Sequence, residues 1–299
     1  MKSHTIHANG QDIHTVFMAP SPEENPHAPA LLMLHGFPEN WRAWASVAQR
    51  LAGEYRLILP DQRGFNLSSK PEGVEAYHTK HLAADMLALL DALDLPQVVL
   101  CGHDWGASVA YALAMRHPER FSHLIIANGV HPVCFQKALY EKGAQRQASQ
   151  YMNVLRAQGA ETHMSADNYA KLFRMFEKFS TAPWLDEAKR AQFIDAWSQP
   201  GAMTAMLNWY RGSPMEVLGM EAPARVLEID DAMREKFHVP MPHLLLWGEK
   251  DTALLEDARA DISAFCDDVQ LETHPHASHW ILHEDADWVA EQVQSFLNE

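Results

Sequence analysis

Short apolar runs alternate with longer amphipathic segments through the first 130 residues of the chain. Short continuous apolar runs are typical of strands buried on both faces. Four such runs lie at 31–34, 56–60, 98–101 and 124–126. Apolar side chains at three- and four-residue spacing predict helices between them, at 41–52, 77–93 and 105–117. This alternation predicts βαβ units, and therefore an α/β fold with a mostly parallel, twisted sheet and helices on both faces.

The alternation stops near residue 131 and resumes near residue 238. Between these points the chain has almost no β-branched runs and is expected to form several helices. Afterwards two strands and a closing helix are expected, at 242–247, 269–273 and 285–296. We therefore predict a first part of the core, an inserted helical lid and a second part of the core, over 1–130, 131–237 and 238–299. A stretch rich in proline and acidic residues, 21–26, is expected to form an exposed turn before the third core strand.

The net charge and the cysteine content limit the ligands and the cellular compartment that the sequence suggests. The formal net charge is -15, from 24 Lys and Arg against 39 Asp and Glu, and such a surface repels nucleic acid and anionic lipid. We see no secretion signal and no apolar stretch near 18 residues, so we expect no membrane span. Three cysteines without paired spacing predict reduced thiols and a cytoplasmic protein. A homodimer is compatible with the sequence.

Residues 102–106 read Gly-His-Asp-Trp-Gly and stand between a predicted buried strand and a predicted helix. This is the spacing of the G-x-S-x-G nucleophile elbow, which exposes its central side chain above the sheet. Here the central residue is Asp104 rather than serine. Alone, Asp104 could merely cap the following helix, as aspartate often does.

Two more polar residues follow predicted strands. Asp251 ends the segment Gly-Glu-Lys-Asp that directly follows the run at 242–247, and His279 comes just after the run at 269–273. Asp251 could instead lie in an ordinary surface turn. The order Asp104, Asp251, His279 is nevertheless the order of nucleophile, acid and base in α/β-hydrolases. His279 also belongs to a group of four histidines, but their spacing lacks a matching acidic partner pattern, so we expect no metal site. Within that group we expect His283 on a solvated helix face.

The loop at 35–39, His-Gly-Phe-Pro-Glu, follows the first clearly buried strand. A loop there can point a backbone N–H at the reacting centre, so the N–H groups of Phe37 and Trp105 are the candidate oxyanion hole. The segment 61–71 contains Asp-Gln-Arg-Gly and is expected to form a structural turn held by buried polar contacts.

With these segments in order, the chain resembles the α/β-hydrolase superfamily over essentially its whole length, and within it the soluble-type epoxide hydrolases. The shared segments are H-G-F-P, D-x-R-G and G-H-D-W-G-A. The resemblance implies a helical lid between the sixth and seventh strands. A glycine is common in the family where Asn66 stands, so that turn is expected to adopt a left-handed conformation, which asparagine tolerates.

The same resemblance implies two lid tyrosines that hold the epoxide oxygen. Tyr210 lies in the segment 208–211, Asn-Trp-Tyr-Arg, and Tyr151 lies in a segment that resembles the upstream site. Either tyrosine could instead serve only to pack the lid. Trp105, Trp209 and both tyrosines are the expected substrate contacts.

The resemblance implies that Asp104 attacks a small apolar epoxide and forms an ester, which water activated by His279 and Asp251 then cleaves, with no cofactor. Haloalkane and fluoroacetate dehalogenases share much of this pattern and are the alternative. The haloalkane enzymes also have tryptophan at the position of Trp105, but usually add a side-chain donor where this chain has Phe37. Fluoroacetate dehalogenases typically have arginine at the Trp105 position. A non-catalytic ligand-binding protein on the same fold is the second alternative.

Overall fold

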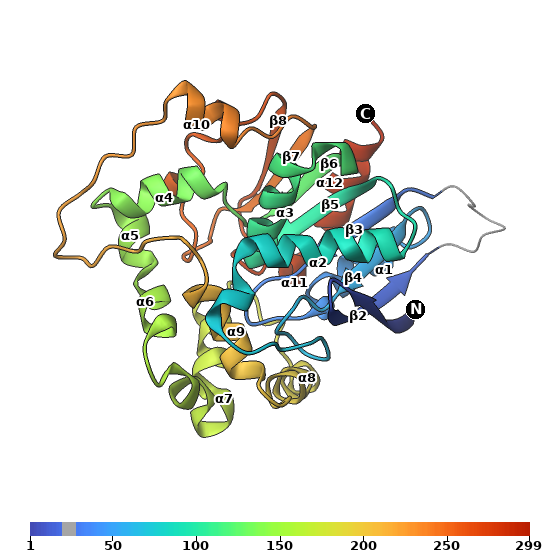
Figure 1. The fold of residues 1–299 in the computed structure, drawn as a ribbon, viewed down its shortest axis with the longest axis horizontal. Coiled ribbons are helices and arrows are strands. Elements are labelled where there is room, and N and C mark those ends of the chain that lie inside the picture. The colour runs from blue at the N-terminus through green and yellow to red at the C-terminus, as the bar shows by residue number, and fades with distance from the viewer. Residues whose placement is uncertain (20–27) are drawn as a thin grey trace.

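The computed structural model describes residues 1–19 and 28–299, so the turn expected at 21–26 lies outside the described part of the chain. Within the described part, eight strands form one twisted sheet in the order β1-β2-β4-β3-β5-β6-β7-β8 (Figure 1). β2 is antiparallel to both neighbours, and all other pairs are parallel. The strands are β1 (Lys2–Ala8), β2 (Gln11–Met18), β3 (Ala30–Leu34), β4 (Arg56–Pro60), β5 (Val98–His103), β6 (Phe121–Ala127), β7 (His243–Gly248) and β8 (Val269–His274).

The α/β fold class expected from the sequence is confirmed, and each of the six predicted strands is present as one of β3 to β8. The hairpin of β1 and β2 had not been assigned from the apolar runs. β1 lies at the sheet edge with mostly exposed side chains, so it carries no continuous apolar run. The two strands are joined at Asn9 and Gly10, both with positive φ, as tight hairpin turns require.

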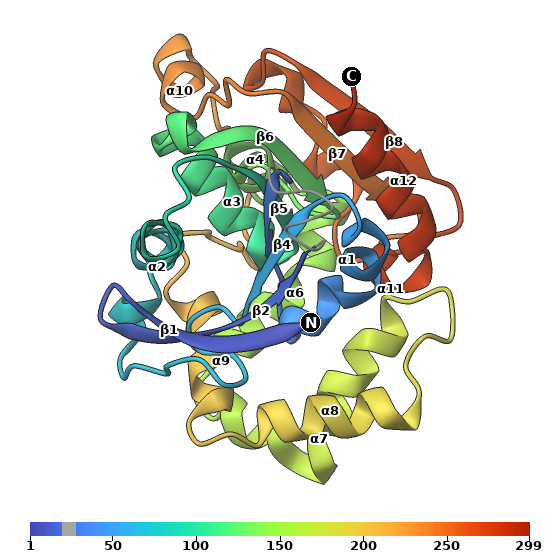
Figure 2. The same ribbon diagram turned by 90° about the vertical axis from the view of Figure 1, so that its right-hand side faces the viewer.

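Helices cover both faces of the sheet (Figure 2). α1, α11 and α12 lie on one face, and α2 and α3 pack on the other. No helix among the described residues is both long and apolar enough to cross a membrane. The helices are α1 (Ala45–Leu51), α2 (Thr79–Ala92), α3 (Trp105–Arg116), α4 (Pro132–Tyr140), α5 (Ala144–Ala148), α6 (Gln150–Arg156), α7 (Ala160–Lys178), α8 (Glu187–Trp197), α9 (Ala202–Arg211), α10 (Asp231–Lys236), α11 (Ile281–Glu284) and α12 (Ala286–Leu297).

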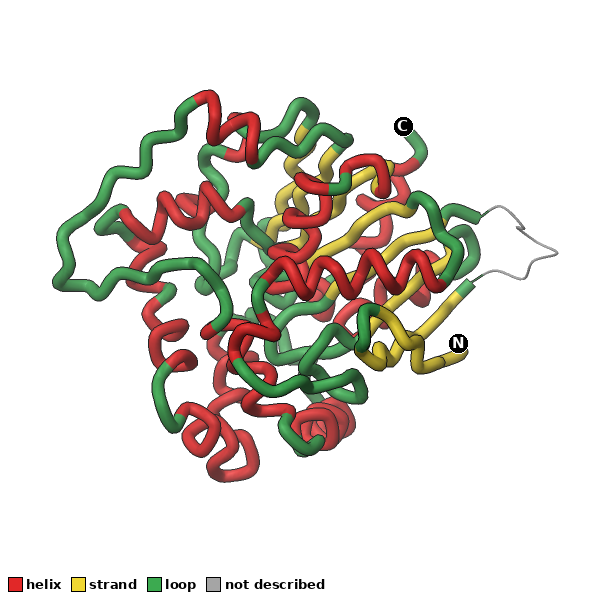
Figure 3. The backbone as a smooth tube through the Cα atoms, in the orientation of Figure 1, coloured by secondary structure: helices red, strands yellow, loops and turns green. Residues whose placement is uncertain are grey.

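The helices α4 to α10 lie between β6 and β7, as expected for an inserted lid. We call residues 131–237 the lid; these bounds, drawn from the sequence, stay a prediction. One part of the lid differs from the expected run of helices. Residues 213–230 connect α9 to α10 without a helix or strand, and Figure 3 shows them as a long loop. Pro214 and Pro223 explain the difference, because proline disrupts a helix interior.

Lid side chains donate hydrogen bonds to backbone carbonyls of the core at several points. The indole N–H of Trp197 donates to Pro38 O at 2.7 Å, and that of Trp209 donates to Arg63 O at 2.9 Å. The hydroxyl of Thr181 donates to the backbone of the loop after β8, at 2.9 Å. Both tryptophans are almost fully buried, so these bonds are shielded from water. The lid is thereby fixed over the ends of the parallel strands.

The turn between β5 and α3 is sharp and closely packed. Asp104 at its tip has φ 51° and ψ -121°, a conformation that few residues other than glycine adopt. Gly106 lies against β3, where a Cβ would be only 2.2 Å from the carbonyl oxygen of Leu34. The second glycine of the motif at 102–106 is therefore needed for close packing of α3 on the sheet.

We expect Gly106→Ala to lower the free energy of unfolding by at least about 1–3 kcal/mol, because its methyl group overlaps a rigid backbone carbonyl. The matched control is Gly53→Ala, where no atom lies within 4 Å of the added Cβ. This control should change stability by no more than about 0.5 kcal/mol. Urea denaturation of both variants makes the comparison, and equal stability of the two would contradict the packing argument.

Candidate active site

Asp104 lies where β5 passes into α3, at the carboxyl end of the strand. Its Oδ1 accepts a hydrogen bond from the backbone N–H of Phe37, with 2.7 Å between the two atoms. Gly36 makes this contact possible, since a Cβ there would lie 2.2 Å from the same oxygen. Trp105, the other predicted backbone donor, is the first residue of α3. One oxygen of Asp104 is thus held by the backbone, which leaves Oδ2 for other contacts.

His279 follows β8 and lies between two carboxylates. Its Nε2 is 3.4 Å from Oδ2 of Asp104, and its Nδ1 is 2.8 Å from Oδ2 of Asp251. Asp251 follows β7, the strand next to β8. Because the carboxyl ends of parallel strands meet at one edge of the sheet, residues far apart in the sequence meet here. The structure brings the three predicted residues into one continuous set of contacts.

Asn128 is a polar residue of this site that sequence reasoning missed. It follows β6 with φ 35°, and its Nδ2 donates to Oδ2 of Asp251 at 2.8 Å. Its own Oδ1 accepts from the backbone N–H of Gly248 at 2.9 Å. The backbone N–H groups of Ala253 and Leu254 donate to the second oxygen of Asp251, at 2.7 and 2.9 Å. The signal for Asn128 was available, because it is polar and directly follows a buried apolar run.

The two carboxylates determine the charge of His279. Burial lowers its pKa, but the negative charges and hydrogen bonds of Asp251 and Asp104 raise it by more, to about 10. The imidazole is therefore protonated at neutral pH. Any reaction that neutralises Asp104 removes one of the causes of this raised pKa.

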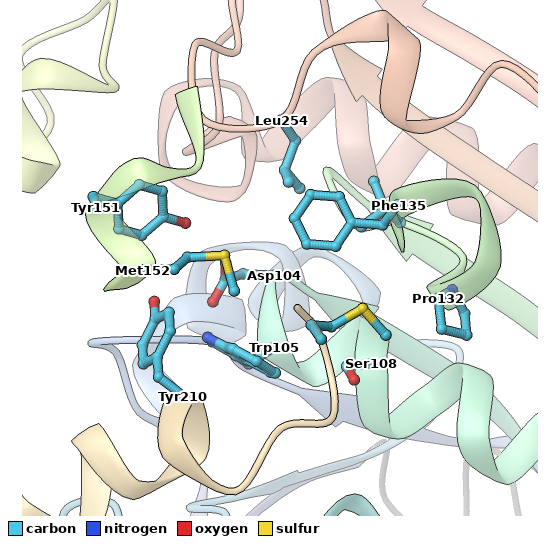
Figure 4. Close-up of a pocket in the computed structure, with 11 residues that line it drawn as sticks. Asp104, Trp105, Ser108, Pro132, Phe135, Tyr151, Met152, Tyr210 and Leu254 are labelled. Atoms are coloured by element: carbon cyan, nitrogen blue, oxygen red, sulfur yellow. The ribbon is translucent and has the colours of Figure 1, made fainter. Parts of the chain in front are cut away.

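Tyr151 on α6 and Tyr210 on α9 both reach the space above Asp104 (Figure 4). Their ring centroids are 6.3 Å apart, and the ring of Tyr210 packs edge-on against Trp105 at 4.9 Å. Burial raises the pKa of each phenol well above its usual value, and the charge of Asp104 adds to the effect. Both hydroxyls are therefore protonated donors at neutral pH.

A cavity extends from Asp104 and the two tyrosines between the lid and α3 (Figure 4). It contains about 510 Å³ of space not occupied by protein atoms, its mouth included. Most of its lining is apolar, which suits a small organic ligand held by a few polar groups. The lining residues are Asp104, Trp105, Ser108, Val130, Pro132, Phe135, Tyr151, Met152, Tyr210, Met215 and Leu254.

Trp209, which we expected to contact the substrate, does not belong to this lining. Its ring packs against Phe65 at 5.2 Å, behind Trp105, and its indole N–H is bonded to Arg63 O. Trp209 is the residue before Tyr210 on α9, and its side chain points away from the cavity. Sequence proximity to a site residue is a poor guide within a helix, because neighbouring side chains lie about 100° apart.

His283 does not lie on a solvated face, contrary to our expectation. Its side chain is 6% exposed, with Nε2 2.6 Å from Oε1 of the buried Glu39. Its ring stacks on that of Trp184 in the lid, with centroids 4.0 Å apart. Burial raises the pKa of Glu39, but His283 and His103 lower it by more, to about 2. The tertiary contact with Glu39, far away in the sequence, draws this histidine into the interior.

The turn at 61–71 is held by buried polar contacts, as expected. Asp61 accepts from the backbone N–H of Trp41 at 3.0 Å and from the amide of Asn66 at 2.7 Å. Asn66 has φ 42°, so its expected left-handed conformation is confirmed. Arg63 pairs with the buried Asp85 of α2, at 2.6 Å. Within the described residues, no group of three or more His, Cys, Asp or Glu side chains could hold a metal ion.

Comparison with known proteins relates this arrangement to a family. A family model described as alpha/beta hydrolase fold matches residues 29–286. The AB hydrolase superfamily protein YfhM of Bacillus subtilis is 30% identical over 299 residues, covering 99% of this chain and 98% of that protein. Epoxide hydrolase 2 of Caenorhabditis elegans is 32% identical over 284 residues, covering 93% of this chain and 76% of that protein.

The solved structures agree. A structure described under novel epoxide hydrolases from metagenomes of hot environments superposes with a TM-score of 0.89 and 31% identity, covering 99% of this chain and 98% of the other. A Bacillus megaterium epoxide hydrolase, at 24% identity and a TM-score of 0.84, shares the fold over 99% of this chain and all of its own. The chain therefore belongs to the α/β-hydrolase fold family and, within it, to the group that includes these epoxide hydrolases.

Proposed function

We propose that this protein converts an epoxide and water into a vicinal diol through a covalent ester on Asp104. The observation that carries the proposal is the opposition of one carboxylate and two phenols across an apolar cavity. Relatives named epoxide hydrolases support it. A carboxylate can attack carbon without first losing a proton, and the phenols can donate to the oxygen that leaves.

In the first step Oδ2 of Asp104 attacks one ring carbon, and the bond from that carbon to the epoxide oxygen breaks. Oδ2 is the attacking atom because Oδ1 is already held by the N–H of Phe37. Tyr151 and Tyr210 hydrogen-bond the ring oxygen and supply the proton that the alkoxide needs. The product of this step is an ester whose carbonyl oxygen is Oδ1.

In the second step His279 takes a proton from water, and the hydroxide attacks the carbonyl carbon of the ester. Negative charge then develops on Oδ1, which the N–H groups of Phe37 and Trp105 stabilise. Asp251 keeps the imidazole oriented through Nδ1, while Asn128 and two backbone N–H groups hold Asp251 in place. The bond between the ester carbonyl carbon and Oδ2 breaks, and the leaving alkoxide takes the second proton of the attacking water. The diol leaves with Oδ2, and Asp104 keeps an oxygen from water and is again a carboxylate.

The protons transferred in the two steps are consistent with the protonation of His279 in the free enzyme. The cycle begins with an imidazolium beside the Asp104 carboxylate. Ester formation removes that negative charge, so the pKa of His279 falls and its proton can replace the one given to the alkoxide. The imidazole is then neutral, as a base must be, and it is protonated again by the attacking water. No cofactor takes part in this sequence.

A dehalogenase reaction has less support from the geometry. A halide leaving group needs side-chain N–H donors, and Phe37 offers none. The indole nitrogen of Trp105 is directed toward the adjacent ring of Tyr210 in Figure 4. A purely ligand-binding role would not require His279 to lie between two aligned carboxylates.

We expect His279→Gln to accumulate the ester, because no base activates the water that cleaves it. Intact mass after mixing with styrene oxide should rise by the mass of the whole epoxide. The control is His279→Gln with Asp104→Asn, which should gain no mass. A gain only from a bromoalkane or fluoroacetate, less the hydrogen halide, would indicate a dehalogenase. No gain from any compound would favour a binding protein.

We expect Tyr151→Phe with Tyr210→Phe to slow ester formation by at least about 10²-fold, because the alkoxide then leaves without a proton donor. Each single variant should lose less, since one phenol remains. Tyr140→Phe is the matched control, because the Tyr140 hydroxyl bonds the exposed Glu216. Rapid-mixing measurements in the His279→Gln background give the rate, and an unchanged rate in the double variant would remove the tyrosines from the mechanism.

The raised pKa of His279 also makes stability depend on pH. The folded state holds the proton up to about pH 10, whereas the ordinary value is 6.5. The stabilisation is therefore fully present below pH 6.5 and is lost as the pH rises through about 10. Urea denaturation of the wild type and His279→Gln between pH 6.5 and 9.5 should show the wild type losing more stability. Parallel pH profiles would mean that His279 is not protonated in the folded protein.

A further inference from the structure

We propose that the site is selective for epoxides with one ring carbon that bears only hydrogen, and that Phe179 imposes this selectivity. The inference rests on the proposed function and deepens it, because it defines the substrate class of the same site. It comes from the shape of the space around Asp104, which is open on one side and filled by aromatic rings on the other.

The open side is the cavity of Figure 4. From Asp104 it continues past Met152 and Leu254 to Phe135 and Pro132 at the start of α4. Its lining there is largely apolar, and Asp104 is the one charged side chain among the described residues that line it. An apolar substituent on one carbon of the epoxide fits this space.

The closed side is the side of His279. The ring of Phe179, at the end of α7, lies 5.9 Å from the ring of Tyr151 and 6.4 Å from that of His279, measured between centroids. Phe179 is 4% exposed and is not part of the cavity lining. It therefore packs against both the tyrosine that would hold the epoxide oxygen and the histidine that would activate water.

Further aromatic rings pack around His279 and make this side rigid. Trp280 packs edge-on against His279 at 4.8 Å, and Phe176 packs against Trp280 at 4.7 Å. Trp197 contacts Phe176 and is fixed by its bond to Pro38 O. A close-packed interior of this kind cannot rearrange to make room for extra atoms at low cost. A methyl group directed here therefore causes steric overlap.

The difference between the open and the closed side matters because the epoxide can be attacked in only one orientation. The two ring carbons are adjacent, and the oxygen between them must face Tyr151 and Tyr210 while one carbon faces Asp104. Substituents on different ring carbons point in opposite directions from this centre. Only one of them can enter the open cavity, and the other meets Phe179. A terminal epoxide leaves a CH₂ group on that side and avoids the overlap.

The test compares styrene oxide with trans-β-methylstyrene oxide, which adds one methyl group on the second ring carbon. The wild type should prefer styrene oxide by at least about tenfold in kcat/KM, the usual cost of one unaccommodated methyl group. Phe179→Ala should reduce this ratio severalfold by raising activity on the disubstituted compound. Phe179→Leu, a smaller change, should move the ratio in the same direction and guards against misfolding of the alanine variant.

Phe135→Ala is the matched control, because it removes an equal ring from the open side of the cavity. It should leave the ratio unchanged, while activity on epoxides with bulkier single substituents rises. Equal kcat/KM of the wild type on both compounds, or a ratio unaffected by both Phe179 variants, would overturn the selectivity proposal alone. Hydrolysis of neither compound, with no ester in His279→Gln, would instead contradict the proposed function.

Discussion

The contact of one imidazole with two carboxylates is the interaction on which the rest of the site depends. Asp104 and Asp251 would repel each other if nothing lay between them, and His279 between them carries the compensating charge. Such an arrangement is stable only if each carboxylate is also hydrogen-bonded. The backbone N–H of Phe37 does this for Asp104, and Asn128 with two backbone N–H groups does it for Asp251. The loops after β3, β6 and β7 are therefore all parts of one electrostatic unit.

The order of the strands in the sheet brings the residues of this electrostatic unit together. Asp104, Asn128, Asp251 and His279 follow β5, β6, β7 and β8, which are consecutive neighbours in the sheet. Parallel pairing places the ends of these strands side by side, although the lid separates the second and third of them by more than a hundred residues of sequence. The inserted lid can thus supply tyrosines to the site without disturbing the polar contacts beneath it.

The core of this arrangement could be predicted from the sequence because its signals are local. Buried strands such as β3 and β5 are continuous apolar runs, and the glycines around Asp104 mark a turn with close packing. What could not be predicted depends on contacts between distant segments. His283 becomes buried only because Glu39 reaches it, and the direction of Trp209 is decided by Arg63 and Phe65. The edge strand β1 escaped assignment because its exposed side chains have no apolar pattern.

The attachment of the lid has a consequence for how this protein tolerates change. Four lid side chains, those of Trp197, Trp209, Thr181 and Gln145, each donate a hydrogen bond to a main-chain oxygen of the core. Every amino acid carries that oxygen, so replacing the side chains of the accepting loops leaves the acceptor in place. Sequence variation in those loops can therefore alter the chemistry at the strand ends, while the lid keeps the main-chain acceptors that these four side chains use.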